Sequence, residues 1–229
     1  MNKRPADQWQ TSEEAAAWDA AGGTALPTRA EQQDLLLALL TRITEGAVLD
    51  LGVGSGLVAE AVLDALPHIE LVGVDFSPSM LDLARERLGR FGLRVHLCIS
   101  DLSTPEQVDL PFRRFCAVFS VQTLHHLDDR EQAAAFTWIA DVLEPGGLVV
   151  VIDRVKVGEA LFDDWRAVWS RIGPAPSGTY AEHATELAAA GDRRSTVEDQ
   201  IVWMRQSGLA ACCLHLYGIR ALIVGRKIP

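Results

Sequence analysis

The chain has 229 residues, of which 48% are hydrophobic and 23% charged, enough apolar material for one sizeable folded domain. Its formal net charge of −10 argues against a partner held through a phosphate backbone, because such binding needs a basic surface. No segment is long and apolar enough to cross a membrane, and the polar residues 1–10 hold no apolar signal region. We therefore expect a cytoplasmic protein.

Strand and helix signals alternate through the first two thirds of the chain. A helix is predicted over 29–43, and Ser77 with Pro78 is typical of a helix start. The predicted order is then strand 47–51, helix 57–66, strand 70–75, helix 78–89, strand 95–100, strand 115–121, a helix from Asp128 or Asp129 to Leu143, and strand 148–152. This rhythm predicts a parallel sheet with helices on both faces.

The remainder of the chain follows a different pattern. Helices are predicted over 159–172 and 180–190, and Ser195-Thr196-Val197-Glu198 matches a capping box that opens a helix ending near Gly208. Only residues 217–220 separate predicted strands at 209–216 and 221–224, which is too short for a parallel crossover. We therefore predict an α/β fold with a doubly wound, mostly parallel sheet that ends in an antiparallel C-terminal hairpin.

The four cysteines indicate neither a metal site nor a disulfide framework. Cys98 and Cys116 lie in apolar, strand-like runs, and Cys212 and Cys213 are neighbours in another such run. None shows the spacing of metal ligands. We interpret all four as reduced thiols packed as small hydrophobic side chains, and we expect no metal.

A glycine-rich run, VLDLGVGSG at 48–56, follows the first strand of the predicted sheet and opens a helix. Its glycines Gly52, Gly54 and Gly56 permit a tight turn and a close approach of the backbone to a ligand. The spacing is not the GxGxxG of dinucleotide-binding proteins. Asp50 inside the run suits a cationic ligand better than a pyrophosphate.

Acidic residues also follow the next two strands. Asp75 ends the second strand at the distance from the glycines at which a carboxylate accepts hydrogen bonds from a ribose diol. Asp101 follows the third strand and could bond an adenine amino group. Either residue could instead cap a helix locally. Because the carboxyl ends of parallel strands meet at one edge of a sheet, three acids there predict a nucleoside site.

Five segments in order resemble the motifs of the Rossmann-like, seven-stranded class I methyltransferases that depend on S-adenosylmethionine (SAM). They are VLDLGVGSG, GVDFSPSML, ISDL, VFSVQTLHHL and LEPGGLVVVID, within residues 47–154. The segment 198–209 resembles a bacterial small-molecule branch of that class. Enzymes that methylate amino groups of nucleic acid bases often carry an Asn/Asp-Pro-Pro-aromatic motif where this chain has Ser120-Val121-Gln122-Thr123, which disfavours that activity.

The resemblance implies SAM as the cofactor and a small-molecule acceptor. From the net charge and the lack of a membrane-spanning segment we expect no nucleic acid or membrane partner. The resemblance places Asp50 at the cofactor's ammonium, Asp75 at the ribose and Asp101 at the adenine edge. The residues implied in cofactor binding are Arg29, Asp50, Gly52, Gly54, Gly56, Asp75, Phe76, Met80, Asp101, Leu102, Ser120 and Val121. The implied organisation is a single domain with a helical cap at 1–45, a SAM-binding core at 46–154, a substrate-pocket insertion at 155–195, and a helix and hairpin at 196–229.

The sequence signals for catalytic and substrate-binding residues are less specific than those for the cofactor site. His125 and His126 follow the fourth strand, and either could accept a proton near neutral pH or merely stabilise the loop. Asp153 and Arg154 could bind a polar substrate or form a salt bridge at the rim. The substrate candidates are Trp18, Asp153, Arg154, Tyr180 and His183. Trp165 and Trp169 could line an apolar acceptor site, although their helical spacing also suits an ordinary core.

Three other functions remain open from the sequence. The first is SAM chemistry without methyl transfer, such as forming a modified SAM for tRNA modification. The second is an NAD-dependent oxidoreductase, which the glycine spacing and the closing hairpin disfavour. The third is a SAM-binding partner protein without catalytic activity.

Overall fold

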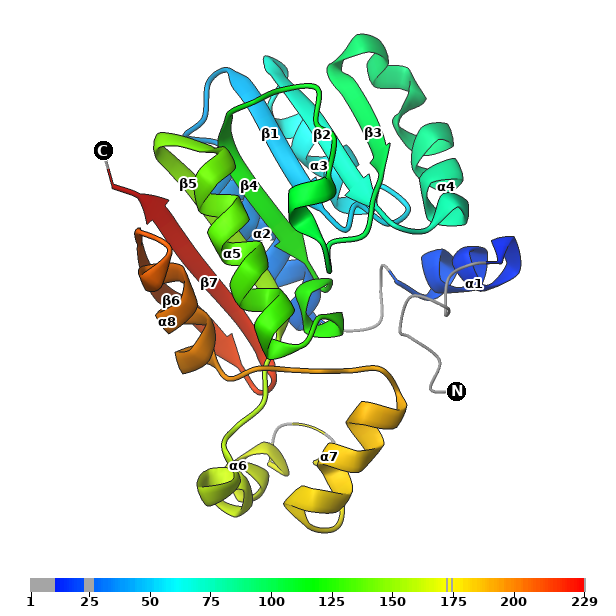
Figure 1. Ribbon diagram of the computed structural model, residues 1–229. Coiled ribbons are helices and arrows are strands. Elements are labelled where there is room, and N and C mark those ends of the chain that lie inside the picture. Colours follow the sequence, from blue (N-terminus) through cyan, green and yellow to red (C-terminus); the bar gives the residue numbers. More distant parts are fainter. Residues whose placement is uncertain (1–10, 23–26, 172, 174, 229) are drawn as a thin grey trace.

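A computed structural model describes residues 11–22, 27–171, 173 and 175–228 (Figure 1). Its centre is a seven-stranded sheet with the order β3-β2-β1-β4-β5-β7-β6. The strands are β1 (Gly46–Leu51), β2 (Ile69–Asp75), β3 (Val95–Ile99), β4 (Phe115–Val121), β5 (Leu143–Arg154), β6 (Leu209–Tyr217) and β7 (Arg220–Lys227). Strand β7 runs opposite to the other six strands and pairs antiparallel with β5 and β6, so the predicted fold class is confirmed.

Helices connect the strands and cover both faces of the sheet. The α-helices are α1 (Ser12–Gly22), α2 (Pro27–Leu40), α3 (Leu57–Ala65), α4 (Pro78–Leu88), α5 (Asp129–Val142), α6 (Phe162–Trp169), α7 (Tyr180–Ala189) and α8 (Val197–Gln206). Short 3₁₀ turns are η2 (Gly89–Arg94), η3 (Pro105–Gln107), η4 (Leu124–His126) and η5 (Glu159–Leu161). No helix within the described ranges is long and apolar enough to cross a membrane.

Two apolar clusters hold the layers together, one on each face of the sheet. On one face, Phe136 of α5 and Met204 of α8 pack against strand residues that include Leu49. On the other face, α2, α3 and α4 pack against residues that include Val48. Successive residues of β1 thus serve opposite faces, as the two-residue period of a strand requires. Since α2 contributes Leu36 and Leu40 to the second cluster, this part of the expected N-terminal cap belongs to the core.

Helix caps follow the predicted starts, with one correction. Ser77 caps α4 by accepting a hydrogen bond from the Met80 N–H. The capping box of α8 is made by Thr196 and Asp199, one residue later than the predicted box that begins at Ser195. Ser195 is fully buried, and its hydroxyl bonds Gln132 and Gln200, so its side chain is used in tertiary packing.

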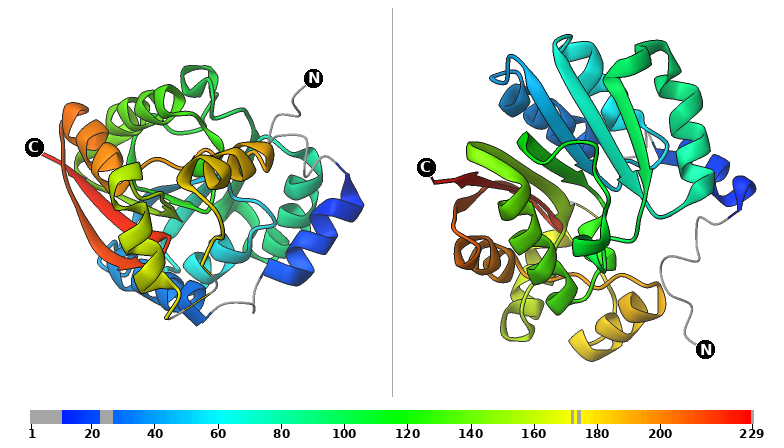
Figure 2. Two further views of the ribbon diagram at one scale, coloured as in Figure 1. Left: turned by 90° about the horizontal axis from the view of Figure 1, so that it is seen from below. Right: turned by 45° about the horizontal axis from the view of Figure 1, so that its top comes forward.

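The predicted helix over 159–172 is also shorter than expected. It is divided into η5 and α6, which ends at Trp169. Gly173 N–H donates back to the Trp169 carbonyl, so the chain turns out of the helix there. The backbone then reaches α7, and both α6 and α7 lie beyond the end of the sheet at which β4 finishes (Figures 1 and 2).

The strand order places a topological switch point between β1 and β4. The chain passes from β1 outward to β2 and β3, then returns to β4 on the other side of β1. Ligands of open α/β sheets bind outside the carboxyl ends of the strands at such a point. The candidate site is therefore the edge formed by the ends of β1, β2 and β4.

Candidate functional site

The glycine-rich turn after β1 is tied to the end of β2. The N–H groups of Gly52 and Val53 both donate to the Val74 carbonyl, at 2.8 and 3.0 Å. Gly52 has a φ of 81°, and a Cβ added to it would lie 2.1 Å from Thr123 Oγ1. Positive φ and the lack of space together require glycine at this position. Gly54 and Gly56 also have positive φ, so all three predicted glycines shape the turn.

Asp75 joins the turn to the adjacent helix. One of its carboxylate oxygens accepts a hydrogen bond from Gly54 N–H and the other from Ser77 N–H, each at 2.9 Å. Burial raises the pKa of Asp75, and these backbone donors oppose that rise. The Phe76 N–H also donates to this carboxylate, so three of its about four lone-pair positions are used and one is left for a ligand hydroxyl. The local structural role and the predicted ribose contact are therefore compatible.

Asp50 is a buried carboxyl close to Asp75. It is 2% exposed at the end of β1, and its pKa is raised well above the ordinary value, first by burial and then by the charge of Asp75. A cationic ligand group beside it would lower that pKa, because an opposite charge favours the carboxylate. This environment fits the predicted contact with an ammonium group.

The residues predicted at the adenine lie at the ends of β2 and β3, which pair in register from Leu71 to Asp75. Met80 and Leu102 are buried, Phe76 is partly exposed, and Asp101 is exposed. Asp101 accepts a hydrogen bond from Ser103 N–H at 2.9 Å, and Ser100 N–H donates to the Asp75 carbonyl. The structure thus brings the third-strand acid to the same edge as Asp75.

Ser120 and Val121 complete the cofactor side from β4. The Ser120 hydroxyl is 1% exposed and donates to the Leu51 carbonyl at 2.9 Å, which joins the ends of β4 and β1. Val121 is partly buried. The side chains of two further candidates, Arg29 in α2 and Trp18 in α1, lie outside the described residues.

A buried histidine–aspartate pair lies next to this edge. His125 in η4 and Asp153 in β5 are 3% and 2% exposed, and Nδ1 donates to the carboxylate at 2.5 Å. The other oxygen of Asp153 accepts the backbone N–H of His125 at 2.9 Å. Burial alone would raise the pKa of Asp153, but His125 and two backbone N–H groups hold it below the ordinary value. The contacts of Asp153 therefore orient His125, and the predicted contact of Asp153 with a polar substrate stays a prediction.

His126 is held uncharged beside this pair. Burial and the neighbouring His125 lower the pKa of His126 to about 4. Its Nδ1 donates to the Gly191 carbonyl at 3.3 Å, and the two imidazole rings lie 4.0 Å apart between centroids. His126 thus links η4 to the segment that follows α7.

A charged network that the sequence did not indicate continues from β5. Arg154 Nη1 lies 3.3 Å from Asp192, so the predicted rim salt bridge is present, and Arg194 binds the same carboxylate at 2.6 Å. Arg154 Nε also donates to Gln122 Oε1 at 3.2 Å. Asp192 and Gln122 lacked a sequence signal because their partner, Arg154, is more than thirty residues away in the chain.

Aromatic side chains of α6 and α7 form a cap over the end of β5. The Phe162 ring stacks on His183 at 5.6 Å and meets the edge of Tyr180 at 5.5 Å. A cavity of about 30 Å³, room for one water, is lined by these residues together with Trp165 and Arg194. Trp165 Nε1 and His183 Nδ1 are buried without a partner in the described part of the chain. Tyr180 and His183 are thus cap residues, and the cap has polar atoms to offer a ligand.

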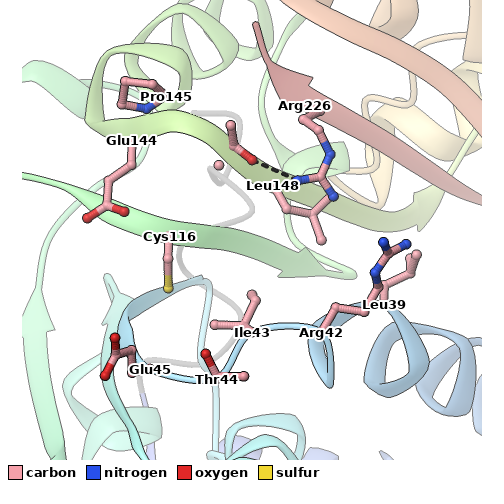
Figure 3. A pocket seen from close by; sticks show the side chains of 12 residues that line it. Leu39, Arg42, Ile43, Thr44, Glu45, Cys116, Glu144, Pro145, Leu148 and Arg226 are labelled. Carbon is pink, nitrogen blue, oxygen red and sulfur yellow. Dashed lines mark hydrogen bonds between the residues drawn. The ribbon is translucent and has the colours of Figure 1, made fainter. Parts of the chain in front are cut away.

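A larger cavity of about 480 Å³ lies at the opposite edge of the sheet (Figure 3). Its lining includes Arg42, Glu45, Cys116 and Arg226, and Arg226 donates to the Gly146 carbonyl at 2.7 Å. These residues surround the amino ends of β1, β4 and β5. Because ligands of such sheets bind at the carboxyl ends, we do not assign the nucleoside site to this cavity. No cluster of metal-binding side chains occurs in the residues described here.

Comparisons with known proteins agree with this geometry. Residues 48–147 match the family described as a methyltransferase domain. An O-methyltransferase family protein from Burkholderia thailandensis aligns over 96% of this chain and 63% of its own length, at 20% identity and a TM-score of 0.71. The chain therefore shares the fold of that structure, and its residues 48–147 carry the sequence pattern of a methyltransferase domain.

Two further comparisons concern particular proteins. A demethylmenaquinone methyltransferase of Deinococcus radiodurans is 32% identical over 136 residues, which is 57% of this chain and 54% of that protein. The structure titled "PigF with SAH" aligns over 99% of this chain and 63% of its own length, at 20% identity and a TM-score of 0.66. The chain thus spans about half the length of the first relative and less than two thirds of either solved structure.

Proposed function

We propose that this protein transfers a methyl group from SAM to a small-molecule acceptor. The observation that carries the proposal is the bond between the glycine turn and Asp75, with buried Asp50 beside them at the switch point. The methyltransferase domain match and the relative named for demethylmenaquinone support it. The net charge of −10 favours a small molecule over a nucleic acid.

The residues at the edge suit this cofactor. Asp50 would bind its ammonium group and Asp75 its ribose hydroxyls, with Asp101 and Leu102 at the adenine. When bound, SAM supplies a methyl group already activated by the sulfonium. The protein must then orient the acceptor, exclude water and remove a proton where the acceptor is a hydroxyl.

We assign the proton acceptor role to His125. The carboxylate of Asp153 accepts the Nδ1–H of His125, so the free lone pair of the ring lies on Nε2. This nitrogen can take the proton from the molecule that is methylated. The carboxylate then stabilises the imidazolium that forms, and Asp153 is a positioning residue. The segment 155–195, with the aromatic cap, would cover the acceptor.

Calorimetric titration with the demethylated product S-adenosylhomocysteine (SAH) tests cofactor binding. We expect Asp75→Asn to weaken binding about ten-fold, the scale of a lost hydrogen bond to a charged group. Asp82→Asn is the matched control, because Asp82 is 73% exposed and pairs only with Arg85 in the described contacts. Absence of SAH binding by the unmodified protein would refute the proposed function.

A further inference from the structure

Gln122, directly after β4, has a strained backbone. Its φ is 58°, and it is the one non-glycine residue with positive φ in the part of the chain that the structure describes. Such a conformation is unfavourable for a residue with a side chain, whereas glycine adopts it freely. The Gln122 N–H donates to the Ile152 carbonyl at 2.8 Å, which holds the strained residue against β5.

In the Gln122 side chain, the carboxamide oxygen has a hydrogen-bond partner, and the carboxamide nitrogen has none among the described residues. Arg154 Nε is a donor only, so the atom it contacts at 3.2 Å must be the carboxamide oxygen, and this fixes the orientation of the amide. The nitrogen Nε2 is then buried and has no acceptor among the described residues. A buried amide donor without a partner is costly, so a ligand or a water must supply the acceptor.

Adjacent residues of the same loop face different strands. Thr123 lies against Gly52, on the side of β1 and the glycine turn. Gln122 contacts Arg154 of β5, the strand that also carries Asp153, the partner of His125. The Gln122 side chain therefore lies toward the residues to which we assign proton removal, and Thr123 lies toward the glycine turn.

We propose that Gln122 selects the acceptor by donating Nε2–H to an oxygen that only accepts hydrogen bonds, a carbonyl or a carboxylate. Arg154 adds donors beside it, since its side chain is 39% exposed and shares the Asp192 carboxylate with Arg194. A hydroxyl at this place would meet donors from both residues and gain less. The inference rests on the proposed function, because it names the acceptor class of the same site.

Three probes with one scaffold test the selection: salicylate, 2′-hydroxyacetophenone and 2-hydroxybenzyl alcohol. Each presents a phenol hydroxyl beside a carboxylate, a ketone or an alcohol. Their binding to the SAH-bound protein is measured by ligand-observed NMR titration, and methylation is followed by SAH release from SAM. We expect the acid or the ketone to bind at least ten-fold more tightly than the alcohol. Whichever of these two probes binds more tightly identifies the preferred oxygen as that of a carboxylate or that of a ketone.

Substitutions at Gln122 separate selection from folding. We expect Gln122→Ala to remove the preference, and Gln122→Glu to weaken the acid most, with SAH affinity unchanged in both. We expect Gln122→Gly to lose the preference while its melting temperature stays level or rises, because glycine relieves the strained φ. Gln206→Glu is the control for added charge, since Gln206 is exposed at the end of α8.

The outcomes distinguish this inference from the proposed function. Loss of SAH binding by the unmodified protein removes both. Normal SAH binding with equal or undetectable binding of the three probes removes the inference alone. So does a preference that survives in Gln122→Ala, or a preference lost only together with a fall in the melting temperature of Gln122→Gly.

Discussion

At the scale of single residues, we expect the buried carboxyl of Asp50 to lower the free energy of unfolding and to strengthen ligand binding. Its carboxyl is 2% exposed and is disfavoured as a carboxylate by burial and by Asp75. We predict that Asp50→Asn raises the free energy of unfolding at pH 7 by roughly 1–2 kcal/mol and weakens SAH binding about ten-fold. Chemical denaturation and calorimetry measure the two effects. A variant that is both less stable and fully competent for SAH would contradict this role.

Gly52 is predicted to be irreplaceable for steric reasons. We expect Gly52→Ala to lower the free energy of unfolding by more than about 2 kcal/mol and to abolish SAH binding, because its Cβ would overlap Thr123 at positive φ. Gly89→Ala is the matched control. Gly89 has a φ of −54° with open space around it, so alanine should be neutral or stabilising. Equal melting temperatures for the two variants would refute the steric argument.

The structure brings together the candidate site residues that the sequence placed at strand ends. Asp50 lies near the end of β1, directly before the glycine turn, and Asp75 ends β2, so their order along the chain was enough to predict that they lie close together. Gln122 carried no such signal, because a backbone torsion and a contact with Arg154 distinguish it. Asp192 was missed for the same reason, since its partner Arg154 lies on β5, and Arg194 binds Asp192.

At the scale of elements, η4 and β5 meet in the His125–Asp153 pair. We predict that His125→Gln lowers the turnover number at least 100-fold, while SAH affinity changes less than two-fold, because the pair lies on the acceptor side. Asp153→Asn should lower turnover through misorientation and shift its pH profile. His96→Gln is a control on a partly exposed histidine. Parallel losses of turnover and SAH affinity would indicate a structural role instead.

The start of α8 shows that a local sequence pattern does not always determine where a helix begins. The motif Ser195–Glu198 and the motif Thr196–Asp199 are both acceptable capping boxes by sequence. The choice between them is made by Gln132 and Gln200, which bond the Ser195 hydroxyl from other parts of the fold. Most helices end within two residues of the prediction, whereas β5 (Leu143–Arg154) and β7 (Arg220–Lys227) extend beyond the predicted strands at 148–152 and 221–224. Pairing with neighbouring strands lengthens β5 and β7 past their apolar runs.

At the scale of the whole molecule, acid should destabilise the fold through His126. Its pKa is about 4 in the folded state and near 6.5 when unfolded, so the unfolded chain binds more protons between these values. Stability is therefore fully present above pH 6.5 and falls as the pH drops toward 4. We predict that the unmodified protein loses about 2 kcal/mol more than His126→Gln between pH 7.5 and pH 5.

Denaturant titrations at the two pH values measure this difference. The raised pKa values of Asp50 and Asp75 act in the opposite direction, but they are common to both proteins and cancel. His68→Gln is the control, since His68 is exposed. Identical pH dependence in the unmodified protein and His126→Gln would contradict the buried, uncharged state of His126.

The architecture of the whole sheet was predictable, whereas the placement of the outer helices was not. Alternating strands and helices, together with a hairpin too short for a crossover, determine the layers and the single antiparallel strand. The position of α2 depends on Leu36 and Leu40 fitting a groove made by distant residues. The cap of α6 and α7 likewise depends on ring contacts between segments, which no periodicity describes.

Hydrogen bonds connect His125 and His126 to the segment that follows α7. Arg193 N–H donates to the His125 carbonyl at 2.7 Å, and the Gly191 carbonyl accepts from His126. Substitutions in the segment after α7 would therefore act, through these two bonds, on the 3₁₀ turn that carries His125 and His126.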